Sequence, residues 1–182
     1  MIKVIFAIGM LFFQSCAENR TESFQKENAT SSEIKIAKTN SAVRIPTLNY
    51  NDLELLLHKK NDTLYIVNFW ATWCKPCIKE LPVFEKINTD YKSEKVKVLL
   101  VSLDFPEQKE KQLIPFIAKR KINSEVVLLD DPDANSWIPK VSTKWSGAIP
   151  ATLLYNKTDR KFYERSFTYE ELEKEIKSIL KK

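Results

Sequence analysis

Two cysteines separated by two residues stand between an apolar run and a segment of helical periodicity, and this junction strongly constrains the fold. Residues 73–77 read Trp-Cys-Lys-Pro-Cys. Residues 64–70 before them predict a buried strand, and the apolar side chains of residues 75–91 recur at helical spacing. The first cysteine then lies at a helix N-terminus, where free backbone N–H groups and the helix dipole favour a thiolate. This arrangement predicts reversible disulfide chemistry.

Two other uses of such a cysteine pair stay open at this point. A zinc site needs two further ligands, and the chain holds only one other cysteine, Cys16, and one histidine, His58. A purely structural disulfide across two residues gains little loop-closure entropy. The residues therefore favour redox chemistry over either alternative.

Composition narrows the class of protein further. The chain has 182 residues, of which 43% are hydrophobic, which is enough for one globular domain with a sizeable core and a tail. The net charge is +5, but no basic stripe interleaved with aromatic residues is visible, so no nucleic-acid partner is indicated. Two glycines, Gly9 and Gly147, are too few for a glycine-rich phosphate loop. We expect no cofactor and no metal.

The N-terminus has the pattern of an export signal. Residues 4–13 are apolar, follow a single Lys3, and are too few to span a bilayer. Cys16 comes directly afterwards and resembles the acylated cysteine of bacterial lipoproteins, so we expect residues 1–15 to be a lipoprotein-type signal peptide. Ordinary signal cleavage after Ala17 is the alternative.

The rest of the chain divides into a polar segment and a folded domain. Residues 16–42 contain few large apolar side chains and predict a flexible tether. Residues 43–182 predict the domain, in which strands and helices alternate before a strand pair and a final helix. The expected strands are residues 64–70, 96–103, 126–129, 151–155 and 161–167, and the expected helices are residues 51–58, 75–91, 107–120 and 169–180, with a helical turn after Asp133. This order predicts an α/β fold with a mixed sheet covered on both faces.

Two motifs in the domain resemble one family. Residues 68–77, followed by Glu80-Leu81-Pro82, and residues 148–153, which read Ala-Ile-Pro-Ala-Thr-Leu, are similar to the thioredoxin-like TlpA/ResA group of extracytoplasmic thiol-disulfide oxidoreductases. The resemblance covers residues 43–182. It implies a thioredoxin fold whose central sheet is flanked by helices, with an extra strand and helix over residues 126–137 before the cis-proline strand.

The resemblance also implies a role for each site residue. Cys74 would be the nucleophile and Cys77 the more buried resolving thiol, together forming the redox-active disulfide. Pro150 would be cis and lie beside the sulfurs, with the backbone of Ile149 pairing with an extended substrate. Trp73 and Pro76 are further candidates for contact with the substrate.

Glu80 is the third candidate catalytic residue. It lies three residues after Cys77, so both side chains share a helix face, and in the family a glutamate at this place influences proton transfer. The alternative is an exposed helix charge. Asn68 stands where cytoplasmic thioredoxins keep a buried acid, and since an amide accepts no proton, proton transfer would pass to Glu80 or water.

The expected function is that of an envelope disulfide reductase. Its partners would be a membrane electron donor and disulfide-containing exported proteins, with apocytochrome c suggested by family analogy alone. Since no aspartate follows Cys16, we expect a periplasm-facing lipid anchor in the outer membrane, or a soluble periplasmic protein if cleavage follows Ala17. The alternatives are a dithiol oxidase or isomerase, a metal-handling module of the copper-chaperone type, and a peroxidase, which would need an isolated cysteine.

Overall fold

The computed structural model describes residues 44–181. The predicted signal peptide, Cys16 and the tether fall outside these residues. Among residues 44–181, no helix is both long and apolar enough to cross a membrane.

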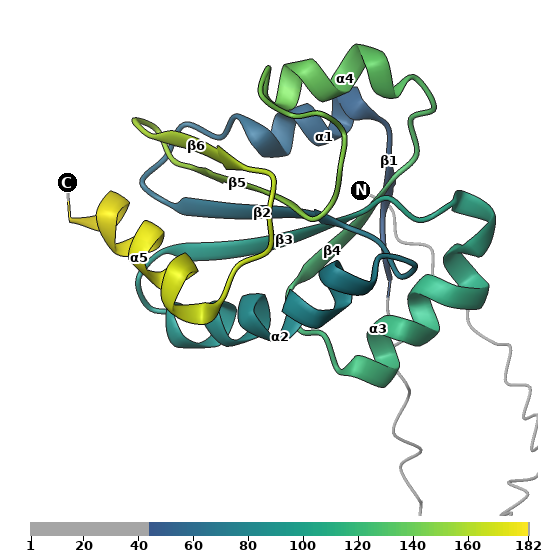
Figure 1. The fold of residues 1–182 in the computed structure, drawn as a ribbon, viewed down its shortest axis with the longest axis horizontal. Coiled ribbons are helices and arrows are strands. Elements are labelled where there is room, and N and C mark those ends of the chain that lie inside the picture. Colours follow the sequence, from purple (N-terminus) through teal and green to yellow (C-terminus); the bar gives the residue numbers. More distant parts are fainter. Residues whose placement is uncertain (1–43, 182) are drawn as a thin grey trace, which may run out of the picture. The chain divides into compact units, whose positions relative to one another are not determined.

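One mixed sheet of six strands, in the order β1-β4-β3-β2-β5-β6, forms the centre of the domain (Figure 1). β2 lies in the middle, parallel to β3 and antiparallel to β5. The strands are β1 (Thr47–Leu48), β2 (Leu64–Trp70), β3 (Val96–Ser102), β4 (Glu125–Leu129), β5 (Ala151–Tyr155) and β6 (Arg160–Tyr163). β4 pairs with β3 in parallel, and β6 pairs with β5 as a hairpin.

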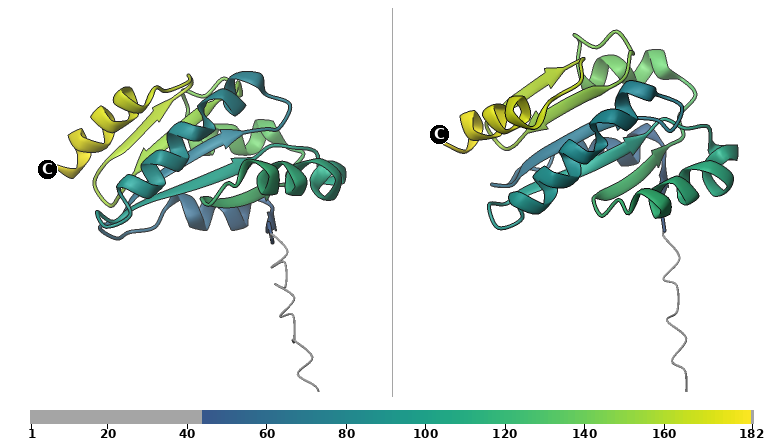
Figure 2. Two further views of the ribbon diagram at one scale, coloured as in Figure 1. Left: turned by 90° about the horizontal axis from the view of Figure 1, so that it is seen from below. Right: turned by 60° about the horizontal axis from the view of Figure 1, so that its bottom comes forward.

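Helices cover both faces of this sheet, which confirms the predicted α/β architecture. α1 and α4 lie over one face, and α2, α3 and α5 lie over the other (Figures 1 and 2). The helices are α1 (Tyr50–Leu57), α2 (Lys75–Asp90), α3 (Ile114–Arg120), α4 (Ala134–Val141) and α5 (Tyr169–Leu180), with a 3-10 turn η1 (Pro106–Gln108) and a π turn η2 (Lys109–Leu113) before α3.

β2 supplies side chains to two separate cores because successive residues of a strand point to opposite faces. Ile66 and Trp70 belong to the core beneath α2 and α5, whereas Val67 and Phe69 belong to the core beneath α1 and α4. All seven residues of β2 are buried. Asn68 is the one polar member, and it faces α2, the helix that carries the cysteines.

The region predicted as one helix over residues 107–120 is divided into three pieces. A 3-10 turn and a π turn precede α3, and the regular α-helix begins only at Ile114. Pro115 has no N–H to donate to the preceding turn, so regular i to i−4 bonding cannot continue backwards through it. The predictions of helical structure over this range and of a disturbance at Pro115 were both correct.

Three other boundaries differ from the prediction. The second strand of the hairpin ends at Tyr163 rather than at residue 167, because the Phe167 N–H donates to a side chain of α2 instead of a sheet partner. Asp133 occupies the N-cap of α4, but its carboxylate accepts no helix N–H, and the helix continues to Val141. β1 has only two residues and was not predicted.

Candidate redox site

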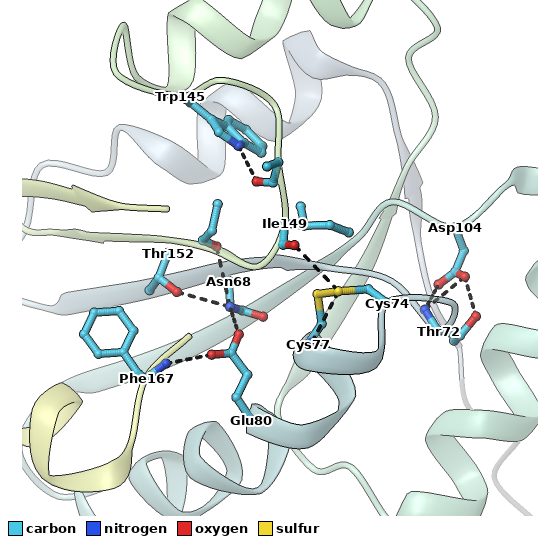
Figure 3. The surroundings of a disulfide bond; sticks show 12 residues. Asn68, Thr72, Cys74, Cys77, Glu80, Asp104, Trp145, Ile149, Thr152 and Phe167 are labelled. Atoms are coloured by element: carbon cyan, nitrogen blue, oxygen red, sulfur yellow. Dashed lines mark hydrogen bonds between the residues drawn. A yellow bond between two sulfur atoms is a disulfide. The ribbon is translucent and has the colours of Figure 1, made fainter. Parts of the chain in front are cut away.

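Cys74 and Cys77 form a disulfide at the N-terminus of α2, directly after the central strand (Figure 3). Their Cα atoms are 5.3 Å apart. Cys74 is the N-cap of the helix, and the Cys77 N–H lies 3.3 Å from Cys74 Sγ and donates to it. The first sulfur therefore occupies the place where helix N–H groups and the dipole stabilise negative charge.

The two sulfurs differ in exposure. Cys74 is 5% exposed, whereas Cys77 is completely buried. This order agrees with the expected roles of an attacking and a resolving thiol.

The loop before β5 closes over Cys74. The Ile149–Pro150 peptide bond is cis, as the resemblance implied. The Ile149 carbonyl oxygen lies 3.8 Å from Cys74 Sγ. Trp145 Nε1–H donates to the Ala148 carbonyl at 2.8 Å and fixes the approach of this loop (Figure 3). The structure thus brings Ile149 and Pro150 to the cysteine pair.

Glu80 is buried, so the alternative of an exposed helix charge is wrong. Its side chain is directed from α2 toward the central strand (Figure 3). It accepts hydrogen bonds from Asn68 Nδ2 at 3.1 Å and from the Phe167 N–H at 2.9 Å. The two hydrogen bonds lower the pKa of Glu80, but the loss of solvent on burial raises it by more. The pKa therefore increases from 4.5 to about 7.

Asn68 connects Glu80 to the cis-proline strand. Its Nδ2 also donates to Thr152 Oγ1 at 3.1 Å, across the β2–β5 register. Among residues 44–181 its Oδ1 has no hydrogen-bond partner, and in Figure 3 this oxygen points to the side on which Cys77 lies. The sequence analysis missed Thr152, although its place two residues after Pro150 could have indicated it.

A second buried carboxylate fixes the loop that leads to Cys74. Asp104, at the end of β3, accepts the Thr72 N–H on both carboxylate oxygens at 3.1 Å and also accepts the Thr72 and Ser102 hydroxyls. Sequence analysis did not single out this residue. Its signal was its position just after the carboxyl end of a strand parallel to β2, where loops converge.

The remaining candidates divide between surface and core. Trp73 is 55% exposed and Pro76 is also exposed, so both can meet a partner. Trp70, the last residue of β2, is completely buried and is not available to a partner. His58 is the C-cap of α1 and comes before the start of β2, whereas the two cysteines come after the end of β2. The histidine and the cysteine pair are therefore separated by the length of this strand.

The fold and the site define a thioredoxin-like protein with a C-x-x-C pair beside a cis-proline. The AhpC/TSA family model matches residues 38–159, and the chain belongs to this family.

Relatives and solved structures agree with this class. The chain is 36% identical over 78 residues to thioredoxin-like protein YneN of Bacillus subtilis, covering 37% of this chain and 45% of that protein. It is 27% identical over 139 residues to thiol-disulfide oxidoreductase ResA of Geobacillus thermodenitrificans, covering 74% and 75%. A thioredoxin-related protein from Neisseria meningitidis has the same fold, with a TM-score of 0.58, 22% identity and coverage of 70% and 91%.

These matches are partial. The matched stretches cover 38% to 61% of several curated relatives, namely YneN, a sporulation thiol-disulfide oxidoreductase and one ResA.

Proposed function

We propose that the protein is a thiol-disulfide oxidoreductase that reduces disulfides in exported proteins. The observation that carries this proposal is the Cys74–Cys77 pair, which caps α2 and lies against the Ile149–Pro150 loop. The curated relatives named thiol-disulfide oxidoreductases support it.

The reaction begins with the reduced protein. The Cys74 thiolate attacks one sulfur of the substrate disulfide, the substrate S–S bond breaks, and the departing sulfur leaves as a thiolate that takes up a proton. Cys77 then loses its proton and attacks Cys74 Sγ, which releases the second substrate sulfur. The substrate gains two electrons, and the protein is left with the disulfide seen in the structure.

In this proposal Glu80 receives the Cys77 proton. It lies one helical turn after Cys77 on the same face of α2, and both side chains are buried. Because its pKa is about 7, its carboxylate can accept a proton near neutral pH and release it again.

Substrate contact is assigned to the surface around Cys74. The half-buried Ile149 lies against the sulfur and offers its backbone to an extended peptide. Trp73 and Pro76 flank the sulfur along the chain and are exposed, so they can contact the residues beside the substrate cysteine.

The N-terminal sequence and the disulfide chemistry support a proposal for where the protein is located and which partners it has. Residues 1–15 would direct export, and Cys16 would carry the lipid that anchors the domain to the outer membrane, facing the periplasm. Cleavage after Ala17 would instead give a soluble periplasmic protein. A membrane dithiol donor would return two electrons to the disulfide, and apocytochrome c is one candidate substrate.

Metabolic labelling with an alkyne fatty acid tests the anchor. We expect label on the wild-type protein and none on Cys16→Ser. Equal labelling of both proteins would overturn the assignment of Cys16.

The reduction potential of the Cys74–Cys77 couple tests the function. The protein is equilibrated with defined thiol and disulfide buffers, and the oxidised fraction is counted by mass after alkylation. A two-electron couple below about −230 mV supports a reductase. A value near about −120 mV would make the protein an oxidant, and the absence of any reversible couple would overturn the redox function.

A further inference from the structure

Two exposed aromatic side chains stand beside the redox site. Trp73 is 55% exposed and Phe105 is 66% exposed. Within residues 44–181 the other exposed large hydrophobic side chains are Leu55 and Leu180, which lie on α1 and α5. Exposed aromatic rings are common anchors of protein interfaces, so this pair requires an explanation.

The buried bridge between Thr72 and Asp104 joins the two loops that carry Trp73 and Phe105 at the carboxyl ends of β2 and β3. The Thr72 N–H donates to the Asp104 carboxylate at 3.1 Å, and Trp73 and Phe105 are the next residues of the two loops. The Leu103 N–H also donates to the Trp70 carbonyl at 2.8 Å. Both loops follow parallel strands, β2 and β3, at their carboxyl ends (Figure 3).

A hollow of about 410 Å³ lies beside Phe105. The loops of residues 103–107 and 129–132 form its walls, and the buried Trp137 closes it. The hollow therefore continues the exposed surface away from Cys74, along the carboxyl ends of β3 and β4.

The charge of this hollow is opposite to that of the chain. Its lining contains Asp104, Glu107, Asp130 and Asp131 and no lysine, arginine or histidine, whereas the whole chain carries a net charge of +5. The carboxylates of Asp104 and Asp131 already accept hydrogen bonds from backbone N–H groups.

Two of these acids remain available to a partner. Glu107 and Asp130 are exposed, and among residues 44–181 their carboxylates accept no hydrogen bond and form no ion pair. The nearby Lys109 donates to Thr47 Oγ1 instead.

We propose that Trp73, Phe105, Glu107 and Asp130 form a docking face for the protein whose disulfide is reduced, and that this face selects a segment with lysine or arginine next to the disulfide. The inference rests on the proposed function and adds a substrate class to it. A cationic side chain of that segment can lie over the Phe105 ring while its charge meets Glu107 or Asp130. Charges of this kind act mainly on the rate of encounter, and their effect decreases with salt.

Two synthetic peptides test the docking face. They share one disulfide loop and differ only in carrying lysine or glutamate on either side of it, and bis(2-hydroxyethyl) disulfide serves as a small neutral substrate. The second-order rate constants for oxidation of the reduced full-length protein are measured by stopped flow. We expect the lysine peptide to react roughly tenfold faster than the glutamate peptide at low salt, and the difference to shrink at high salt.

Variants separate charge from packing. The double variant Glu107→Gln/Asp130→Asn should reduce the ratio of the two peptide rate constants to roughly twofold. The control Glu125→Gln/Glu170→Gln removes two exposed acids elsewhere and should leave this ratio unchanged. Phe105→Ala should slow both peptides, the lysine peptide more because it also loses the contact of its cation with the ring, and should leave the rate with the small disulfide unaltered.

The outcomes distinguish this inference from the function on which it rests. Equal rates for the two peptides, or a ratio that survives in Glu107→Gln/Asp130→Asn, would overturn the docking face while the reductase activity stands. Failure to react with the small neutral disulfide would overturn the proposed function and the inference together.

Discussion

Glu80 shows how burial changes the acid-base properties of one carboxyl group. The domain places a carboxyl among apolar side chains and gives it two hydrogen-bond donors, Asn68 Nδ2 and the Phe167 N–H. These donors favour the charged form, but loss of solvent disfavours it more, so the pKa rises from 4.5 to about 7. The carboxyl is therefore half-protonated near neutral pH, where an acid-base group is most useful.

Removing this carboxyl should change the pH profile of the reaction. We expect Glu80→Gln to lower the rate of disulfide exchange by roughly 10² at neutral pH and to remove an inflection near pH 7. The profile of kcat/KM from pH 5 to 9 measures this effect. Glu125→Gln is the exposed control, and an inflection near pH 7 that persists without Glu80 would contradict the assignment.

The same pKa predicts how stability depends on pH. The folded state holds the Glu80 proton more tightly than the unfolded chain, so the stabilisation is complete below about pH 4.5 and is lost as the pH rises through 7. The shift corresponds to about 3 kcal/mol in the free energy of unfolding. Urea denaturation at several pH values should show wild type losing about this much relative to Glu80→Gln. A difference that stays constant with pH would rule the effect out.

The order of attack by the two sulfurs is also testable at the level of single residues. With Cys77→Ser, the mixed disulfide between Cys74 and substrate cannot resolve and should accumulate. With Cys74→Ser, the completely buried Cys77 should form little of it. Mass spectrometry of non-reduced protein measures both. Accumulation on Cys77 instead of Cys74 would reverse the assigned roles.

At the scale of elements, the start of α5 is tied to the redox site. Thr168 Oγ1 accepts the Glu171 N–H, and the Glu171 carboxylate accepts the Thr168 N–H, which together make a capping box. The preceding residue, Phe167, is the one whose N–H donates to Glu80. The helix cap therefore also helps to hold the hydrogen bond between the Phe167 N–H and the Glu80 carboxyl in place.

Thr168→Ala should reduce the free energy of unfolding by about 1 kcal/mol, because a helix N–H loses its acceptor. Thr168→Ser should restore most of the stability, and alanine at the exposed Thr143 should have little effect. Urea denaturation measures all three. Equal stability of Thr168→Ala and wild type would show that the capping box contributes nothing.

At the scale of the whole molecule, both cores are built from residues 44–181. One core lies between the sheet and α2, α3 and α5, and the other lies between the sheet and α1 and α4. Residues 44–181 all lie within one compact unit. A domain with two complete cores has what it needs to fold alone.

A fragment of residues 41–182 should accordingly unfold cooperatively and have the reduction potential of the full chain. A shorter fragment of residues 58–182 should not, because it lacks β1 and the buried Tyr50, Leu53 and Leu57 of α1, which leaves one face of the sheet uncovered. Circular dichroism on heating measures both. Cooperative unfolding of the shorter fragment would contradict the importance of α1.

The sequence by itself determined most of the helices and strands and the position of the cysteine pair. The apolar run of β2, the periodicity of α2 and the cysteine spacing are local properties, and they predicted the strand, the helix and the position of Cys74 at their junction. The resemblance of the motif around Pro150 to a known family implied the cis peptide. Such features are carried by neighbouring residues, so no knowledge of packing was needed.

Tertiary structure alone decided the environment of those atoms. The pKa of Glu80 depends on burial and on two hydrogen-bond donors that lie 12 and 87 residues away in the chain. The loops that carry Trp73 and Phe105 are joined by the hydrogen bonds between Thr72 and Asp104, which are 32 residues apart. The end of β6 also depends on a long-range hydrogen bond, that of the Phe167 N–H. The start of α3 depends on Pro115. Long-range hydrogen bonds and desolvation arise only when distant segments pack together, and the local pattern of residues does not encode which of them will meet.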